Sequence, residues 1–186
     1  MSGHGAPQVT DVAQADGLNV TIVAGSWHEE ISNGLIDGAQ RYLDQSGASS
    51  TLVMVPGSFE LPLACQHALA GGADAVVALG VIVRGGTPHF EYVASAATDG
   101  LTRVALDSGK PVGFGVLTVD TDEQGLDRAG LPGSTEDKGF EAADAAVEQT
   151  EEAVEATEEA VEATEEAATE AVEATEDAAA DAAQTA

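Results

Sequence analysis

The sequence predicts an α/β fold: a three-layer sandwich in which a four-stranded parallel β-sheet has helices on both faces. Two observations predict it. Short aliphatic runs alternate strictly with longer segments of helical periodicity, which is typical of parallel sheets joined by crossover helices. The aliphatic runs are also continuous rather than alternately apolar and polar, which is the pattern of strands that are covered on both faces.

Four strands are expected where β-branched and aliphatic residues gather. The first reads LNVTIVAG and the third, ADAVVALGVIV, is the most apolar segment of the chain. The four strands cover residues 18–25, 51–55, 73–83 and 110–119.

Helices are expected between and after these strands. Residues 28–47 carry apolar side chains at helical spacing, and Gly47 is placed to end that helix. A Thr or Asp ahead of Glu123 begins a short helix that closes on Gly130. The remaining predicted helices cover residues 58–72, 89–109 and 140–150, the last packed on the domain.

The composition divides the chain into three parts. Residues 1–17 are small and polar and are expected to form a flexible arm, followed by an α/β domain over 18–150. Residues 151–186 form a low-complexity acidic Ala/Glu tail, either helical or disordered. The valines of the tail, seven residues apart, are too sparse for a coiled-coil seam. A role for the tail in assembly or partner binding stays open.

The charge of the chain is strongly negative, −27 at pH 7. Of the 33 acidic residues, 16 lie between Glu141 and Asp181, and no Lys or Arg follows Lys138. Nucleic acid is excluded as a partner, because no basic face exists to displace counterions from phosphates. Only two lysines among so many acids predict a halophilic source, where salt screens the repulsion. The alternative is an acidic surface without halophily.

The sequence also predicts a soluble, cytoplasmic protein. Cys65 is the single cysteine, which fits a reducing compartment. The N-terminal segment has neither a basic start nor an apolar stretch, so no signal peptide is expected. No membrane association is expected either, since AVVALGVIV is far shorter than the roughly 20 residues that span a bilayer.

Unusual polar residues follow every predicted strand. Trp27 and His28 follow the first, and the others lie at 56–60, 84–89 and 118–122. In parallel sheets ligands bind outside the carboxyl ends of the strands. We therefore expect one binding site at this end of the sheet.

The loop RGGTPH after the third strand is typical of an anion site. Adjacent glycines let the backbone approach a ligand, and a helix starting near Pro88 favours negative charge at its N-terminus. Gly86 and Thr87 are expected to hold a phosphate or carboxylate, although a plain strand-to-helix turn is the alternative. His89, in the first turn, can exchange protons near neutral pH. It is far in sequence from any cysteine or carboxylate cluster, so no metal site is expected.

Three further positions allow two interpretations each. Glu60 either complements the dipole of a helix capped by Ser58 or binds a polyhydroxyl chain together with residues 58 and 59. Trp27 either stacks on a flat heterocycle or packs in the ordinary way. Arg128 is either an ion-pair partner for the many acids or a phosphate ligand.

Together these segments resemble the lumazine synthase family, over about residues 18–148. The resemblance is carried by VPGSFELPLA, ALGVIVRGGTPHFEYVA, GLTRVALDSGKPVGFGVLTVDTDEQGLDRAG and DKGFEAA. It implies riboflavin biosynthesis: 5-amino-6-(D-ribitylamino)uracil condenses with 3,4-dihydroxy-2-butanone 4-phosphate to give 6,7-dimethyl-8-ribityllumazine, phosphate and water. It further implies a homopentamer, often assembled into icosahedral shells of sixty chains, and neither metal nor cofactor.

The resemblance also implies roles for individual residues. Trp27 would stack on the pyrimidine, and His89 would be the catalytic proton-transfer residue. Phe114 would reach the site of a neighbouring chain, so that the site exists only in an oligomer. The remaining substrate-binding positions are Ser58, Phe59 and Glu60 for the ribityl chain, the backbone of Val81, Ile82 and Val83 for the uracil edge, and Gly86, Thr87, Arg128 and Lys138 for the phosphate.

A non-catalytic flavin- or lumazine-binding protein, or a shell-forming scaffold on the same fold, is the alternative to the enzyme. His89 and Arg128 favour the enzyme, since storage needs only the stacking residue. The enzyme interpretation makes one spatial prediction. Trp27, Glu60, His89 and Arg128 should converge around one cavity that is completed by an adjoining chain's Phe114.

Overall fold

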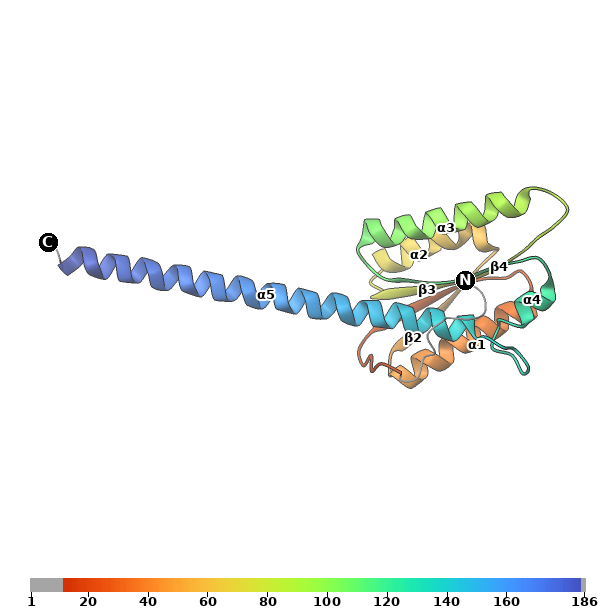
Figure 1. Cartoon of the computed structure of the whole chain (residues 1–186), viewed down its shortest axis with the longest axis horizontal. Coiled ribbons are helices and arrows are strands. Elements are labelled where there is room, and N and C mark those ends of the chain that lie inside the picture. Colours follow the sequence, from red (N-terminus) through yellow and green to blue (C-terminus); the bar gives the residue numbers. More distant parts are fainter. Residues whose placement is uncertain (1–11, 185–186) are drawn as a thin grey trace. The chain divides into compact units, whose positions relative to one another are not determined.

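The structure, a computed structural model, describes residues 12–184, with side chains described over 12–164 except at Glu158. Four parallel strands form one sheet in the order β2-β1-β3-β4 (Figure 1). They are β1 (Asn19–Gly25), β2 (Ser49–Val55), β3 (Ala75–Val83) and β4 (Val112–Val119). The predicted fold class is confirmed.

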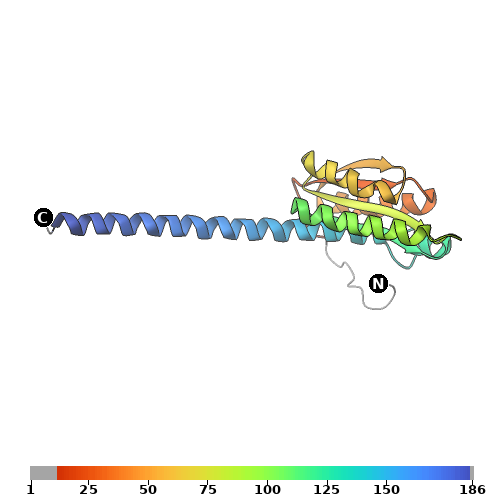
Figure 2. The ribbon, with the colours of Figure 1, turned by 90° about the horizontal axis from the view of Figure 1, so that it is seen from above.

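Helices cover both faces of this sheet. On one face lie α1 (Glu29–Ser46) and the first part of α5 (Lys138–Gln184), packed around Leu35, Tyr42 and Val147. On the other lie α2 (Leu61–Ala70) and α3 (His89–Ser108), packed around Cys65 and Leu101. Figure 2, in which the ribbon is seen from above, shows α3 (green) running along the sheet. These two apolar cores fix the three layers.

The strand register places one end of β3 beyond its neighbour β1. The last pairing of β1 with β3 joins Ala24 to Leu79, whereas β3 stays paired with β4 up to Val83 and Val119. Residues 80–83 of β3 therefore extend past β1. The 3₁₀ turn η1 (Ser58–Glu60), which follows β2, lies beside them, with Ser58 against Gly80. This stagger leaves a recess at the carboxyl ends of the strands.

The edge strand β2 differs from the sequence prediction of strands covered on both faces. Leu52, Val53 and Met54 are exposed in the single chain. The physical reason is that β2 pairs only with β1 and forms the margin of the sheet. An apolar, unpaired strand edge is a ready surface for association.

The loop after β4 also differs in detail. The short helix α4 (Asp122–Leu126) begins as predicted, with the Thr121 hydroxyl accepting a hydrogen bond from the Gln124 amide. It ends at Leu126 rather than near Gly130, because Asp127 turns the chain back: its carbonyl accepts from the amides of Thr135 and Glu136. This folded loop carries Arg128 and leads into α5.

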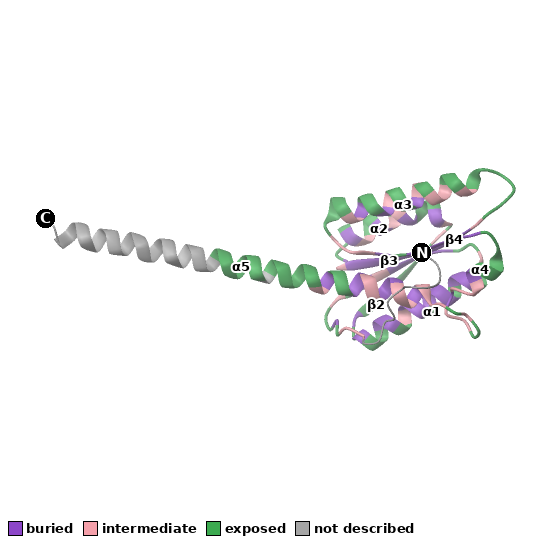
Figure 3. Ribbon diagram, viewed as in Figure 1, coloured by how far each residue is buried: buried purple, intermediate pink, exposed green. Residues whose placement is uncertain are grey.

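The chain divides into two compact units between Thr150 and Glu151, and α5 belongs to both. In the first unit Ala143, Val147 and Thr150 are buried, so the predicted packing of 140–150 is confirmed. In the second unit α5 is helical to Gln184, and the described side chains beyond Glu151 are exposed (Figure 3). No helix of the described residues is both long and apolar enough to cross a membrane.

The predicted N-terminal arm lies outside the described residues up to position 11. Its remainder is attached to the domain. Ala15 is buried, and its amide donates to the Ser46 carbonyl across 2.6 Å.

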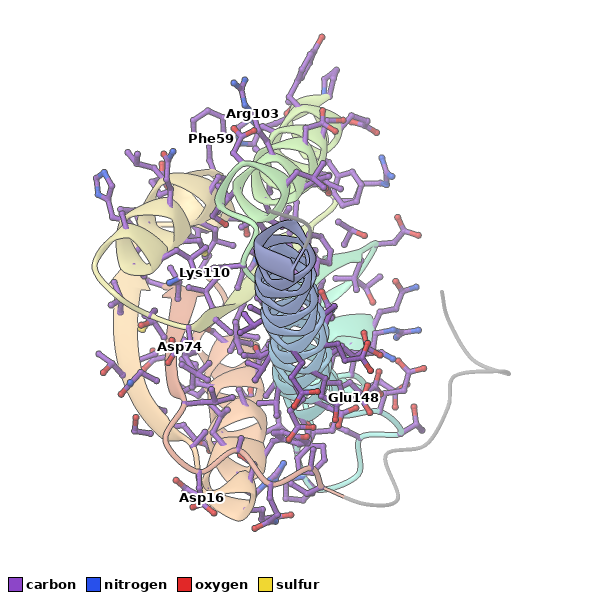
Figure 4. All side chains as sticks on the ribbon, turned by 90° about the vertical axis from the view of Figure 1, so that its left-hand side faces the viewer. Asp16, Phe59, Asp74, Arg103, Lys110 and Glu148 are labelled. Atoms are coloured by element: carbon purple, nitrogen blue, oxygen red, sulfur yellow. The ribbon has the colours of Figure 1, made fainter. Side chains whose placement is uncertain are left out.

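Polar groups at the other end of the sheet, where the strands begin, serve the backbone. The Asp74 carboxylate accepts from the Asn19 amide at 2.9 Å, and the Lys110 ammonium donates to the Ala73 carbonyl at 2.7 Å. Figure 4 looks onto this end and shows both side chains beside the strand starts. These contacts give hydrogen-bond partners to backbone groups where the strands begin, and neither side chain lines the cavity described below.

The buried Cys65 thiol gives a pH-dependent prediction. Burial raises the pKa of Cys65 from 9.0 to about 12, so the folded protein keeps a proton that the unfolded chain releases above pH 9.0. Stability present below pH 9.0 is therefore lost as the pH rises toward 12, by about 1.4 kcal/mol per pH unit. Urea unfolding between pH 8 and 10 should show a steeper loss for the wild type than for Cys65→Ala. Equal slopes would contradict this assignment.

Candidate functional site

A cavity of about 600 Å³ opens at the carboxyl ends of β1 and β3. It collects side chains from four parts of the chain: the turn after β1, η1, the end of β3 and the start of α3. The lining residues are Trp27, His28, Gly57, Ser58, Phe59, Glu60, Val81, Ile82, Val83, Gly85, Thr87, His89, Phe90 and Val93. The site therefore has apolar walls with a few polar groups, as small-molecule sites do.

Trp27 and Glu60 flank Gly57 in one wall. The Glu60 carboxylate accepts a hydrogen bond from the Gly57 amide at 2.9 Å. A Cβ on Gly57 would lie 3.3 Å from the Trp27 ring and 3.5 Å from that carboxylate, so glycine lets the indole lie against the turn. Trp27 is 68% exposed, so its ring is available to a ligand instead of filling the core.

Ser58 and Phe59 form the adjoining wall. Ser58 is buried against Gly80 of β3, where a Cβ would come within 2.6 Å of the Ser58 hydroxyl. Neither Ser58 nor another side chain caps α2, so the alternative of Ser58 as a helix cap is not what the structure shows. Phe59 is 63% exposed and is labelled at the surface in Figure 4.

The loop from β3 to α3 is fixed by Arg84. Its guanidinium contacts Asp120 at 2.8 Å and Glu91 at 2.5 Å, and lies 4.0 Å from the centre of the Phe90 ring. The hydrogen bond from Arg84 lowers the pKa of the Glu91 carboxyl. These contacts tie the first turn of α3 to the end of β4. They therefore hold the loop that carries Gly85 and Thr87 at the cavity.

His89 is the first residue of α3, as predicted, and lines the cavity. Pro88 stands at the N-cap of this 20-residue helix, whose free amides face the same end. A proton-transfer group and a helix N-terminus thus lie together. That combination can bind an anion and move a proton beside it.

Four of the residues named from the sequence do not line the cavity. Gly86 is exposed in the loop, next to the lining residue Gly85. Phe114 lies on the exposed side of the edge strand β4 and is 46% exposed. Arg128 and Lys138 lie in the folded loop after α4 and at the start of α5. The expected convergence of four residues within a single chain is thus met by Trp27, Glu60 and His89 but not by Arg128.

Arg128 and Lys138 share a carboxylate. Glu136 lies 3.5 Å from each of the two cations, and Arg128 also donates to the Gln124 carbonyl at 2.8 Å. Burial opposes the positive charge of Lys138, but Glu141 and Glu136 outweigh it and raise the pKa of Lys138. In the single chain, Arg128 is therefore an ion-pair partner of an acidic residue, which is the first of its two sequence interpretations.

The cavity holds no arginine or lysine among its lining residues, all of which belong to the described part of the chain. Nor do the described side chains include a group of three His, Cys, Asp or Glu fit for a metal ion. A phosphate in this cavity would meet backbone amides, Thr87 and His89, and would need a cation from elsewhere.

Sequence reasoning placed His28 at the binding end of the sheet without giving it a role, and it missed Phe90 and Val93 as lining residues. His28 directly follows Trp27 after β1, and its position at the end of a strand was a usable signal. Val93 lies four residues after His89 and three after Phe90, which are helical spacings, so the helix start contained part of that information.

Comparison with known proteins gives the family. Residues 17–153 match the family model described as 6,7-dimethyl-8-ribityllumazine synthase. A protein of that name from Leifsonia xyli is 71% identical over 147 residues, which is 79% of this chain and 93% of that protein. A Clavibacter michiganensis protein is 65% identical over 148 residues (79% and 92%), and one from Streptomyces avermitilis 55% over 148 residues (79% and 91%), both with the same name.

These relatives are actinobacterial, so the halophilic source expected from the charge is not supported. Much of the misleading charge lies in the acidic tail, which continues beyond the end of the family match at residue 153. The family match covers most of the chain and includes every residue that lines the cavity. The chain belongs to the 6,7-dimethyl-8-ribityllumazine synthase family.

Proposed function

We propose that this cavity is where 5-amino-6-(D-ribitylamino)uracil and 3,4-dihydroxy-2-butanone 4-phosphate condense to 6,7-dimethyl-8-ribityllumazine, phosphate and water. The chain is a transferase of riboflavin biosynthesis. The observation that carries the placement is that Trp27, Glu60 and His89 line a single cavity of about 600 Å³. A flavin-storage role would need the stacking surface but would leave His89 without a purpose.

The pyrimidine substrate occupies the half of the cavity beside β1 and η1. Its ring stacks on the exposed indole of Trp27, which already lies against the Gly57 turn. The ribityl hydroxyls bind Ser58, the Phe59 backbone and the carboxylate of Glu60. The end of β3, Val81–Val83, presents its backbone to the uracil edge beyond the last pairing with β1.

The phosphorylated substrate occupies the half beside α3. Its phosphate lies on the amides of Gly86 and Thr87 and at the α3 N-terminus. The pyrimidine amine attacks the ketone to form an imine with loss of water, phosphate leaves, and the second amine closes the ring with loss of a further water. His89 relays protons in these steps, and the cavity orients the two substrates, which lowers the entropic barrier.

The site is completed by a neighbouring chain in a homo-oligomer, a pentamer that can assemble further into sixty-chain shells. Two observations support this. The cavity has no cation of its own, while Arg128 and Phe114 lie outside it. The exposed apolar residues Leu52 and Met54 on β2 also offer a surface for association. We place this assembly in the cytoplasm, where the free Cys65 stays reduced.

Arg128 and Lys138 form the cationic part that the neighbour supplies. In the single chain both cations face one carboxylate, Glu136. An incoming phosphate carries more charge than that carboxylate and accepts bidentate hydrogen bonds from the guanidinium. Phosphate therefore competes with Glu136 for the two cations.

The turnover assay of the purified chain tests the proposal, with Trp27 as the probe of pyrimidine binding. Trp27→Ala removes the stacking surface, and we expect the KM for the pyrimidine to rise about tenfold, a loss of roughly 1–1.5 kcal/mol. Trp27→Phe keeps a ring and should stay within about threefold of the wild type. An unchanged KM in Trp27→Ala, or no lumazine formed by the wild type, would overturn the placement.

A further inference from the structure

The backbone of His28 has an unusual conformation. With φ 57° and ψ 62° it is left-handed, and among residues 12–184 it is the one non-glycine residue with a positive φ. Residues other than glycine rarely adopt this backbone conformation, and those that do are often found at functional sites. His28 occupies the N-cap of α1, yet its side chain makes no capping hydrogen bond. Helix capping therefore does not explain the conformation.

The imidazole instead contacts α4. Its Nδ1 lies 3.1 Å from Oδ1 of Asp122, the first residue of that helix. The same imidazole lines the cavity beside Trp27, and the His28 side chain is 29% exposed. The left-handed turn thus brings one ring nitrogen to a carboxylate while the ring borders the proposed substrate site.

A carboxylate at Nδ1 fixes the chemistry of the other nitrogen. It holds the proton on Nδ1, so that Nε2 of the neutral ring is the hydrogen-bond acceptor and proton acceptor. We propose that His28, positioned by Asp122, is a second proton-transfer residue, acting at the pyrimidine amine while His89 acts beside the phosphate. This inference rests on the proposed function of the cavity.

The amine nitrogen forms a bond to the ketone carbon, and its proton passes to Nε2 of His28. The ketone oxygen becomes a hydroxyl group, with its proton supplied by water or by His89. When the carbon–oxygen bond breaks, Nε2 returns its proton to that hydroxyl, which leaves as water, and the carbon–nitrogen double bond forms. The second proton of the amine nitrogen then returns to the hydroxide ion or to the His89 ring that had protonated the ketone oxygen. His28 ends neutral, and no electrons are gained or lost by the chain.

Several titratable groups surround this imidazole. Asp122 faces it from α4, Glu60 and His89 share the cavity from η1 and α3, and Glu29 and Glu30 follow it in α1. The pH profile of kcat in the wild type is therefore a property of this group of residues. Removing His28 should change the shape of that profile. Removing a purely structural contact should instead lower kcat by the same factor at every pH.

The decisive variant is His28→Gln. Its amide can still donate to Asp122 but cannot accept and return a proton. We expect kcat to fall about tenfold or more, with both KM values within about twofold and the unfolding midpoint unchanged. The pH profile should lose one ionisation. If His28 is only a structural tie between the β1–α1 turn and α4, His28→Gln keeps the wild-type kcat and pH profile, and the inference is overturned.

Two further variants complete the experiment. Asp122→Asn should lower kcat less than His28→Gln does, because it removes the orienting charge but keeps the imidazole. Asp107→Asn is the matched control, since it breaks an exposed ion pair with Arg103 at 3.0 Å on α3 without touching the cavity, and it should leave kcat unchanged. A wild type that forms no lumazine contradicts the proposed function, whereas an active wild type with an equally active His28→Gln contradicts only this inference.

Discussion

Replacing His89 by alanine is expected to lower kcat by about 10²-fold, at the low end of what one general acid–base residue contributes. The loss is moderate because orientation of the substrates by the cavity remains, and because His28 borders the same cavity. The KM for the pyrimidine should change little, since Trp27 and Glu60 are untouched. Steady-state formation of 6,7-dimethyl-8-ribityllumazine, followed by its fluorescence, gives both constants.

The chain supplies its own control for this variant. His67 lies on α2 and is exposed, away from the lining of the cavity. His67→Ala should therefore keep the wild-type kcat, which separates loss of one imidazole from loss of the proton relay. Equal rates for His89→Ala and wild type would remove His89 from the mechanism.

Mixed oligomers should recover activity from two defective variants. In the proposed site, Arg128→Ala would remove the cation that a neighbour contributes, and His89→Ala would remove the proton relay of the chain's own cavity. If each site combines one chain's His89 with its neighbour's Arg128, random co-assembly leaves about a quarter of the sites with both residues intact. Activity should then exceed the sum of the two separate variants by roughly tenfold or more, since each alone loses about 10².

Co-expression with two affinity tags gives the mixed oligomers, and tandem purification isolates them. Mixing His89→Ala with His89→Gln is the control, because no combination of those chains restores a site. Activity of the mixed preparation equal to the mean of the two separate preparations would show that the two residues do not complement across chains. That result would contradict the shared site.

The fold was predictable because its signals are local. The continuous aliphatic run that became β3 is buried on both faces, and Gly47 ends α1 in the left-handed conformation that glycine favours. His89 begins α3 and lies at the cavity as the loop chemistry indicated. The helices on both faces of the sheet follow from the same pattern, whereas the strand order β2-β1-β3-β4 was not predicted from the sequence.

The remaining features depend on contacts that no local pattern records. Arg128 meets Glu136 because Asp127 folds the loop back, and nothing in the spacing of the two residues predicts that turn. The left-handed backbone of His28 arises where β1 passes into α1 next to α4, which is a tertiary arrangement. Exposure of β2 depends on its place at the sheet margin, not on its composition.

A crystal structure of the assembled protein with 5-amino-6-(D-ribitylamino)uracil and inorganic phosphate tests the central claim most directly. The account predicts the pyrimidine on the Trp27 ring, the ribityl chain along Ser58 to Glu60, and phosphate between the start of α3 and Arg128 of an adjoining chain. Ligands bound elsewhere while this cavity stays empty would contradict it.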